Sequence, residues 1–166
     1  THAVLMNDIG HQLFPSPGLG VDQDYSEALR YYTLAAEQGN ATAQNNLAVA
    51  YQTGQGVDKD YSQAVRYFKM AADQGITVAQ YNLAVMYQAG RGVNQDWHEA
   101  LKYYRLAADQ GYVLAQHSLA VMYAQGEGAK QDYSEALFYF KLAADQGYAP
   151  AQCNLAIMYA NGHGGP

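Results

Sequence analysis

The fold is decided by the nine-residue sequence AQYNLAVMY at residues 79–87. Close variants recur at residues 43–51, 115–123 and 151–159, so the same sequence returns every 36 residues. Comparing residues 54–89 with residues 90–125 position by position gives 18 identities in 36 positions. A fixed period of this length is typical of repeat proteins, in which each unit is a small supersecondary structure stacked on the next.

Each repeat predicts two helices. In the first, Ala79, Leu83 and Tyr87 are four residues apart and therefore share one helix face. A glycine three residues later is suited to end this helix in a left-handed cap. The second helix follows Asp96, and Glu99 stands three residues further on, which is the spacing of a capping box. The same aspartate recurs as the expected N-cap in the other units, at Asp24, Asp60 and Asp132.

These signals predict nine helices, at residues 3–14, 25–38, 41–53, 61–74, 77–89, 97–110, 113–125, 133–146 and 149–161. One helix pair cannot bury both of its faces, whereas stacked neighbours can. We therefore predict an all-α solenoid that forms a single domain over residues 1–166. Within it, a degenerate helix occupies residues 1–17, and about four repeats occupy residues 18–53, 54–89, 90–125 and 126–162.

The composition limits the classes of partner. Hydrophobic residues make up 49% of the chain, which is enough for a buried core. The net charge is −6 and no basic face stands out, so we expect no nucleic-acid binding. No apolar run of about 18 residues is present, so we expect a soluble chain without membrane insertion. No signal peptide is visible, but the sequence starts at Thr1 rather than Met, and the compartment stays open.

Motifs that would support catalysis are incomplete. The Gly-x-Gly pairs in the loops lack the third glycine or the Gly-Lys-Ser/Thr of phosphate-binding loops. His98 is not followed by a second histidine four positions later, so no zinc-protease motif exists. His117 and the single cysteine, Cys153, share one repeat position, but the spacing between repeats exceeds the roughly 2.6–3.2 Å that a nucleophile and its base need. We therefore expect no enzyme activity, no metal and no cofactor.

The repeat resembles a known family. Residues 79–93 follow the pattern AQxNLAxMYxxGxGV, and residues 96–111 follow DxxxAxxYYxxAAxxG. This sequence is similar to the Sel1-like repeat, a relative of the tetratricopeptide repeat with a longer loop between its helices. The resemblance covers residues 18–162 and implies a right-handed superhelix that serves as an interaction scaffold or adaptor for a protein or peptide. The Helicobacter cysteine-rich members carry paired cysteines, whereas this chain has one cysteine.

The resemblance also implies where a partner binds, because the first helix of each related unit lines the concave groove. Val85 is two residues from both Leu83 and Tyr87, about 200° around a helix, so it points away from the buried stripe. The predicted groove residues are Asn45, Asn46, Val49, Gln52, Val78, Tyr81, Asn82, Val85, Gln88, Leu114, His117, Ser118, Val121, Asn154 and Ile157.

Two interpretations of these residues stay open. The valines either form an apolar line along the groove or pack against the helix of the neighbouring unit. The asparagines either bond to local backbone or pair with the main chain of a partner through their donor and acceptor groups. The functional alternative is a neutral, partly apolar groove that holds an extended or helical segment of another protein.

A structural role is the second hypothesis. Residues 149–161 form the first helix of a unit whose second helix is missing from the sequence. The apolar residues Leu155, Met158 and Tyr159 therefore lack the polar capping element that the ends of solenoids need. Either the native protein continues beyond Pro166, or this end binds another molecule, such as a second copy of the chain. An enzyme is the remotest alternative.

Overall fold

The computed structural model describes residues 24–164 and places eight helices in them. These are α1 (Tyr25–Glu37), α2 (Ala41–Thr53), α3 (Tyr61–Asp73), α4 (Thr77–Ala89), α5 (Trp97–Asp109), α6 (Val113–Gln125), α7 (Tyr133–Asp145) and α8 (Ala149–Ala160). The all-α prediction is confirmed, but the described part of the chain has eight helices where nine were predicted. The ninth, predicted at residues 3–14, lies outside the described residues.

The predicted helix starts are confirmed by their caps. Asp60 accepts a hydrogen bond from the backbone N–H of Gln63 at 3.1 Å, and the other three aspartates do the same in their own units. The second helix of each repeat ends one residue earlier than predicted. Gln110, for example, takes the C-cap position, where its backbone N–H bonds to Ala107 in a tightened last turn. Gly126 ends α6 in the left-handed conformation, with φ 74°.

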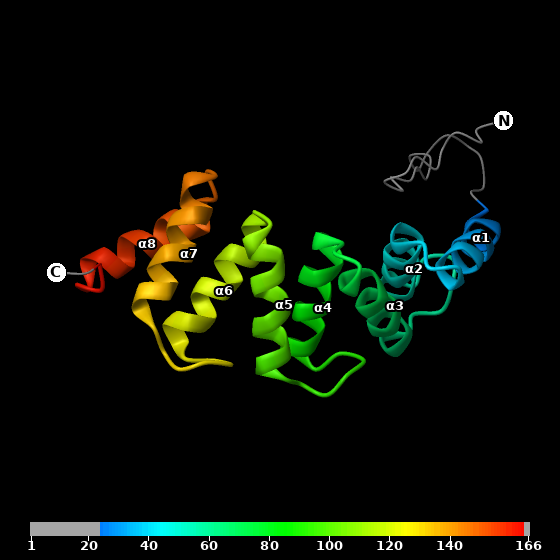
Figure 1. Ribbon diagram of the computed structural model, residues 1–166, viewed down its shortest axis with the longest axis horizontal. Helices are drawn as coiled ribbons and strands as arrows, with labels where there is room; N and C mark the ends of the chain where they lie inside the picture. Colours follow the sequence, from blue (N-terminus) through cyan, green and yellow to red (C-terminus); the bar gives the residue numbers. More distant parts are fainter. Residues whose placement is uncertain (1–23, 165–166) are drawn as a thin grey trace. The chain divides into compact units, whose positions relative to one another are not determined.

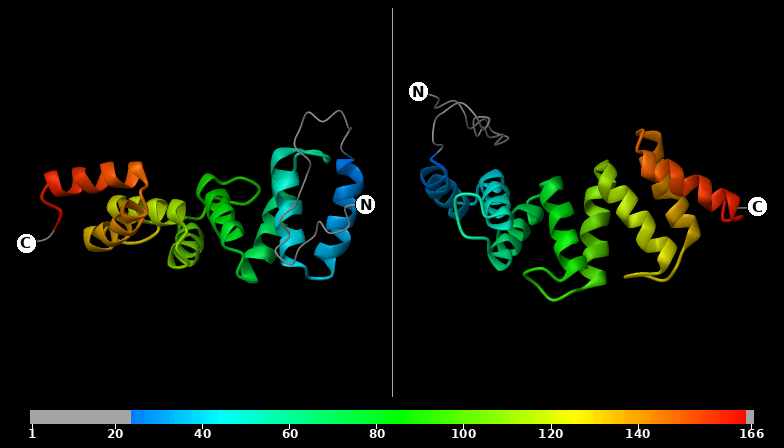
Figure 2. Two further views of the ribbon diagram at one scale, coloured as in Figure 1. Left: turned by 90° about the horizontal axis from the view of Figure 1, so that it is seen from above. Right: turned by 180° about the vertical axis from the view of Figure 1, so that it is seen from behind.

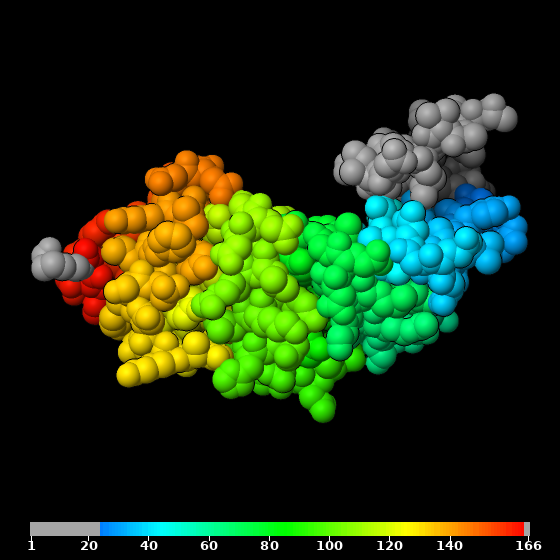
Figure 3. Space-filling model, viewed as in Figure 1, coloured from blue at the N-terminus to red at the C-terminus, as the bar shows by residue number. Residues whose placement is uncertain are grey.

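The chain forms two compact units, Thr1–Ile76 and Thr77–Pro166. Unit 1 contains α1, α2 and α3, and unit 2 contains α4 to α8. Within each unit every helix packs on the helix before it and the helix after it in the chain. Figures 1 and 2 show the helices of unit 2 following one another in chain order, and the colours of the space-filling view in Figure 3 follow the same order.

Unit 2 has two layers of helices. Side chains on α4, α6 and α8 bond to one another, as His117 does with Asn154, so these first helices form one layer. Tyr139 on α7 donates a hydrogen bond to Asp109 on α5 at 3.1 Å, so these second helices form the other layer. The layers meet in a core of alanines and rings, where Leu83, Tyr103 and Tyr104 are at most 1% exposed.

Buried glutamines connect successive helices. Gln116 on α6 is 3% exposed, and its Nε2 donates to the backbone oxygen of Ala108 at the end of α5. Its Oε1 accepts a hydrogen bond from Nε2 of Gln146 at 2.7 Å. Gln80 accepts from Gln110 in the same way. In unit 1, Gln74 donates to Gln44, whose Nε2 in turn donates to the Ala36 carbonyl.

Candidate functional site: the surface of the first helices

The predicted groove residues lie on α2 in unit 1 and on α4, α6 and α8 in unit 2. None of them is fully buried: most are half-buried, while Val78 and Ile157 are 37% and 51% exposed. Val85 is half-buried although its neighbours Leu83 and Tyr87 belong to the core. As the helix periodicity predicts, Leu83 and Tyr87 lie on the buried face of α4 and Val85 lies on a different, partly exposed face, called the second face below.

In unit 1, the two asparagines of α2 have different surroundings. Asn46 hydrogen-bonds the hydroxyl of the buried Tyr32, and this bond opposes the increase in the Tyr32 pKa that burial causes. The Oδ1 of Asn45 is buried and has no hydrogen-bond partner in the part of the chain that the structure describes. Val49 and Gln52 are half-buried on the same helix.

In unit 2, Tyr104 contacts several of the predicted groove residues at one end of the surface. This ring is buried, and burial strongly raises the pKa of its hydroxyl. The hydroxyl donates to Oε1 of Gln88 at 2.5 Å, and Ser118 also hydrogen-bonds it. The Tyr81 ring lies 5.7 Å from the Tyr104 ring and 5.1 Å from the Tyr112 ring. Gln88 and Ser118 thus have a side-chain partner, Tyr104, inside unit 2.

At the other end of the surface, His117 and Asn154 form a pair. Asn154 Nδ2 lies 2.9 Å from His117 Nε2, across two first helices of successive repeats. The imidazole packs against the rings of Phe140 and Tyr148, with ring centroids 5.7 and 5.3 Å away. Desolvation by these neighbours lowers the pKa of His117 below its ordinary value. The neutral imidazole is therefore favoured, and its ring nitrogen holds the asparagine amide in place.

A pocket opens beside this pair. Its volume is about 300 Å³, and it is called the apolar pocket below. It is lined by Val121, Ala124, Gln125, Phe140, Asn154, Ile157 and Met158. Phe140 and Met158 are 3% and 5% exposed and form its floor, while the half-buried Val121 and the exposed Ile157 form its walls.

The surface of the first helices of unit 2 is uncharged. The three first helices α4, α6 and α8 contain no Asp, Glu, Lys or Arg. The charged residues of unit 2 belong to α5, α7 and the loops. A partner on the first-helix layer therefore meets amides, hydroxyls and apolar groups.

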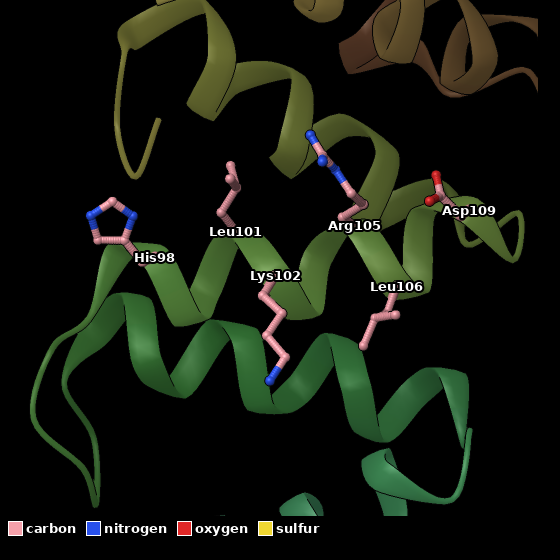
Figure 4. A pocket seen from close by; sticks show the side chains of 6 residues that line it. All are labelled: His98, Leu101, Lys102, Arg105, Leu106 and Asp109. Carbon is pink, nitrogen blue, oxygen red and sulfur yellow. The ribbon is translucent and has the colours of Figure 1, made fainter. Parts of the chain in front are cut away.

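The second helices carry another hollow. Figure 4 shows the six residues that line it, all of them on α5: His98, Leu101, Lys102, Arg105, Leu106 and Asp109. Its volume is about 350 Å³, but its cations already have partners. Lys102 lies over the Tyr103 ring at 4.9 Å, and Arg105 lies over the Tyr123 ring at 5.5 Å. We interpret this hollow as the solvated outer face of the second-helix layer.

Few of the described side chains are placed for metal binding or catalysis. They contain no group of three or more His, Cys, Asp or Glu side chains that could hold a metal ion. Cys153 is exposed, while the nitrogen of His117 that faces α8 is bonded to Asn154. Among the same residues, no helix is long and apolar enough to cross a membrane.

Sequence reasoning missed part of the site. Phe140 and Met158 were not among the predicted groove residues, yet both line the apolar pocket. The signal for Phe140 was weak, since every second helix has an aromatic residue at that repeat position. Its neighbours in space lie 14 to 19 residues away on two other helices, which periodicity does not reveal.

Comparison with known proteins places these features in a family. The Sel1 repeat model matches residues 6–40, 41–76, 77–112, 113–148 and 149–166. The predicted number of about four repeats is therefore slightly low, since five segments match and the last is short. The segment 113–148 contains α6 and α7, and the segment 149–166 contains α8. A search of the curated proteins found no match.

Solved structures with the same repeat are similar to this chain. A protective antigen of uropathogenic Escherichia coli with an SLR fold is 41% identical, with a TM-score of 0.81 over 84% of this chain and 30% of its own. A Sel1 repeat protein from Oxalobacter formigenes is 32% identical, with a TM-score of 0.80 over 86% of this chain and 58% of its own. Cysteine-rich protein B of Helicobacter pylori, at 21% identity and a TM-score of 0.62, covers 83% of this chain and 99% of its own, and shares the fold. The chain thus spans less than two thirds of the first two relatives.

Proposed function

Because the chain belongs to the Sel1 repeat family, we propose that it is a non-enzymatic scaffold that binds a segment of another protein on the layer formed by its first helices. Sel1 repeat proteins are generally scaffolds for protein–protein interactions, and the family is typically non-enzymatic.

One observation carries the choice of surface. Residues at the second face of α4, α6 and α8 are apolar and half-exposed at three successive repeats, namely Val85, Val121 and Ile157. Asn82 and Asn154 stand next to them in the helix register and supply amide groups. An apolar line flanked by amides suits a peptide, because the amides can pair with its main chain while the line contacts its side chains.

Peptide-display selection tests the surface. Peptides selected on the wild type should lose binding to the double variant Val85→Arg/Val121→Arg, because two cations then stand in the apolar line. The matched control is Leu106→Arg/Phe138→Arg, which adds the same two charges at exposed sites of the other helix layer. Circular dichroism would establish that each variant is folded. Equal loss in both double variants, or no loss in the first, would place binding elsewhere.

A second candidate function is self-association through α8. Tyr159 is 47% exposed, whereas the equivalent rings Tyr87 and Tyr123 are 9% and 5% exposed. Those two rings stack on Tyr103 and Tyr139 of the following helices, with centroids 6.1 and 6.3 Å apart. A second copy of the chain could cover Tyr159 with a comparable ring.

Light scattering across a concentration series tests this candidate. A mass that doubles with concentration in the wild type and stays constant in Tyr159→Ser would support self-association. A constant monomeric mass at every concentration would remove it and would leave the peptide-binding proposal unaffected.

A further inference from the structure

The apolar pocket defines the chemistry of the partner. We propose that it binds one large uncharged side chain of an extended, uncharged protein segment, and that the amide of Asn154 holds the main chain of that segment. This inference rests on the proposed function of the first-helix surface. The apolar pocket is the part of the surface that provides specificity, and it selects a large uncharged side chain.

The size and lining of the pocket fit one side chain. A volume of about 300 Å³ is at the lower end of the range for ligand pockets, which is too small for a folded element. Its floor consists of the buried Phe140 and Met158, and Ile157 stands at its open side with half of its surface exposed. An aromatic or long aliphatic side chain would remove these apolar surfaces from water.

The charge distribution excludes a charged occupant. No Asp, Glu, Lys or Arg lines the pocket, and none occurs on α4, α6 or α8. A charged side chain that entered would lose its hydration without gaining an opposite charge. The nearest polar groups are the amides of Gln125 and Asn154, which are neutral. Electrostatics therefore favour an uncharged segment.

The amide of Asn154 favours an extended main chain. One of its N–H groups faces His117 Nε2 at 2.9 Å, so its second N–H and its oxygen are left for a partner. No other side-chain hydrogen bond of Asn154 occurs in the part of the chain that the structure describes. The main chain of a helix already uses its own N–H and C=O groups, whereas an extended segment has both to offer. The amide at the pocket edge is thus complementary to an extended segment.

The test fills the pocket without adding charge. Ala124→Phe places a ring in the wall of the pocket, and Ala160→Phe makes the same change at the same repeat position of α8, outside the pocket lining. The probe is the tightest end-blocked peptide from selection on the wild type, together with its alanine-scan variants. Affinities are measured by fluorescence anisotropy.

The expected result has three parts. Ala124→Phe weakens the probe at least tenfold, while Ala160→Phe leaves its affinity within about twofold. One apolar residue of the probe loses at least tenfold on replacement by alanine in the wild type and little in Ala124→Phe, because the two changes remove the same contact. Asn154→Ala weakens the probe about tenfold, the loss expected for one well-made hydrogen bond. Asn94→Ala, at an exposed asparagine in the loop before α5, is its control and should leave the affinity unchanged.

Other outcomes overturn the inference and separate it from the proposed function. Equal affinities of Ala124→Phe and Ala160→Phe, with binding still lost in Val85→Arg/Val121→Arg, would keep the surface and reject the pocket. A consensus peptide with an essential acidic or basic residue would reject the uncharged partner. A dimer that disappears in Ala124→Phe would show that a second copy of the chain occupies the pocket. If Ala124→Phe does not fold, the alanine scan and Asn154→Ala decide the question.

Discussion

Gln146 donates a hydrogen bond from its Nε2 to Oε1 of Gln116 at 2.7 Å, across 30 residues of sequence. The pair Gln110 and Gln80 has the same geometry one repeat earlier. Gln116 therefore joins the helix before it to the helix after it, since its own Nε2 bonds a carbonyl at the end of the preceding helix, and Gln44 does the same in unit 1. This relationship recurs with the period of the sequence and fixes the register between stacked helices.

Replacing Gln116 with Leu should lower the free energy of unfolding by about 1–3 kcal/mol, because the carbonyl of Ala108 then has no donor from this side chain. Urea unfolding followed by circular dichroism measures the change. Gln125→Leu is the control, an exposed glutamine on the same helix, and should shift the value by about 0.5 kcal/mol at most. If Gln116→Leu proved as stable as the wild type, packing rather than hydrogen bonding would join the helices.

Leu83→Ala should lower the free energy of unfolding by about 2–5 kcal/mol, because this side chain is 0% exposed and its removal leaves a cavity in the core of unit 2. The same urea titration measures it. Leu106→Ala, at a leucine that is 41% exposed, should cost about 0.5 kcal/mol. Similar losses in the two variants would mean that the buried face of α4 is assigned wrongly.

The lowered pKa of His117 predicts how stability depends on pH. The unfolded chain binds a proton at this imidazole near pH 6.5, and the folded chain binds it only at lower pH. Between the two pKa values the unfolded state holds more protons, so stability rises with pH there and is lost as the pH falls below about 6.5. Between pH 7.5 and pH 5, the wild type should therefore lose more stability than His117→Gln.

Urea unfolding of both proteins at the two pH values measures this difference. His98→Gln, at an exposed histidine of α5, is the control for the effect of the substitution itself. If His117→Gln and the wild type lose the same stability, the imidazole is not desolvated by Phe140 and Tyr148.

Alanine substitutions at Gly128 and Gly147 distinguish the cost of backbone strain from the cost of a steric clash. Both have positive φ, at 76° and 86°, so alanine at either position should cost about 1–2 kcal/mol for the left-handed conformation. At Gly128 an added Cβ would also meet the backbone oxygen of Trp97 at 2.5 Å, whereas at Gly147 it meets nothing within 4 Å. Gly128→Ala should therefore lower the melting temperature more than Gly147→Ala does. Equal shifts would show that the loop moves to accommodate the methyl group.

The sequence by itself determined the helices. Each helix within residues 24–164 starts at the predicted residue, and each second helix ends within one residue of its predicted end. The reason is that these boundaries depend on local interactions. Asp60 caps a helix through a backbone N–H three residues away, and Gly126 ends one through its own left-handed conformation.

The sequence also determined which face of a first helix is buried, because a period of 3.6 residues places Leu83 and Tyr87 on one side and Val85 on the other. The 36-residue period indicated a repeat protein, and the residue pattern of residues 79–93 and 96–111 carried the resemblance to the family, since both are properties of the sequence alone. The buried face can be predicted within one repeat, and the residue pattern can be recognised by comparing similar repeats.

Only the tertiary structure decided how side chains from different helices meet. The glutamines recurred in every repeat, but their partners lie 30 residues away on another helix, beyond the reach of helix periodicity. The apolar pocket needs Phe140 of α7 between residues of α6 and α8, and Asn154 bonds to His117, an imidazole 37 residues away, not to local backbone. Such contacts depend on how closely alanine-rich helices approach, which is set by the packing of the whole unit.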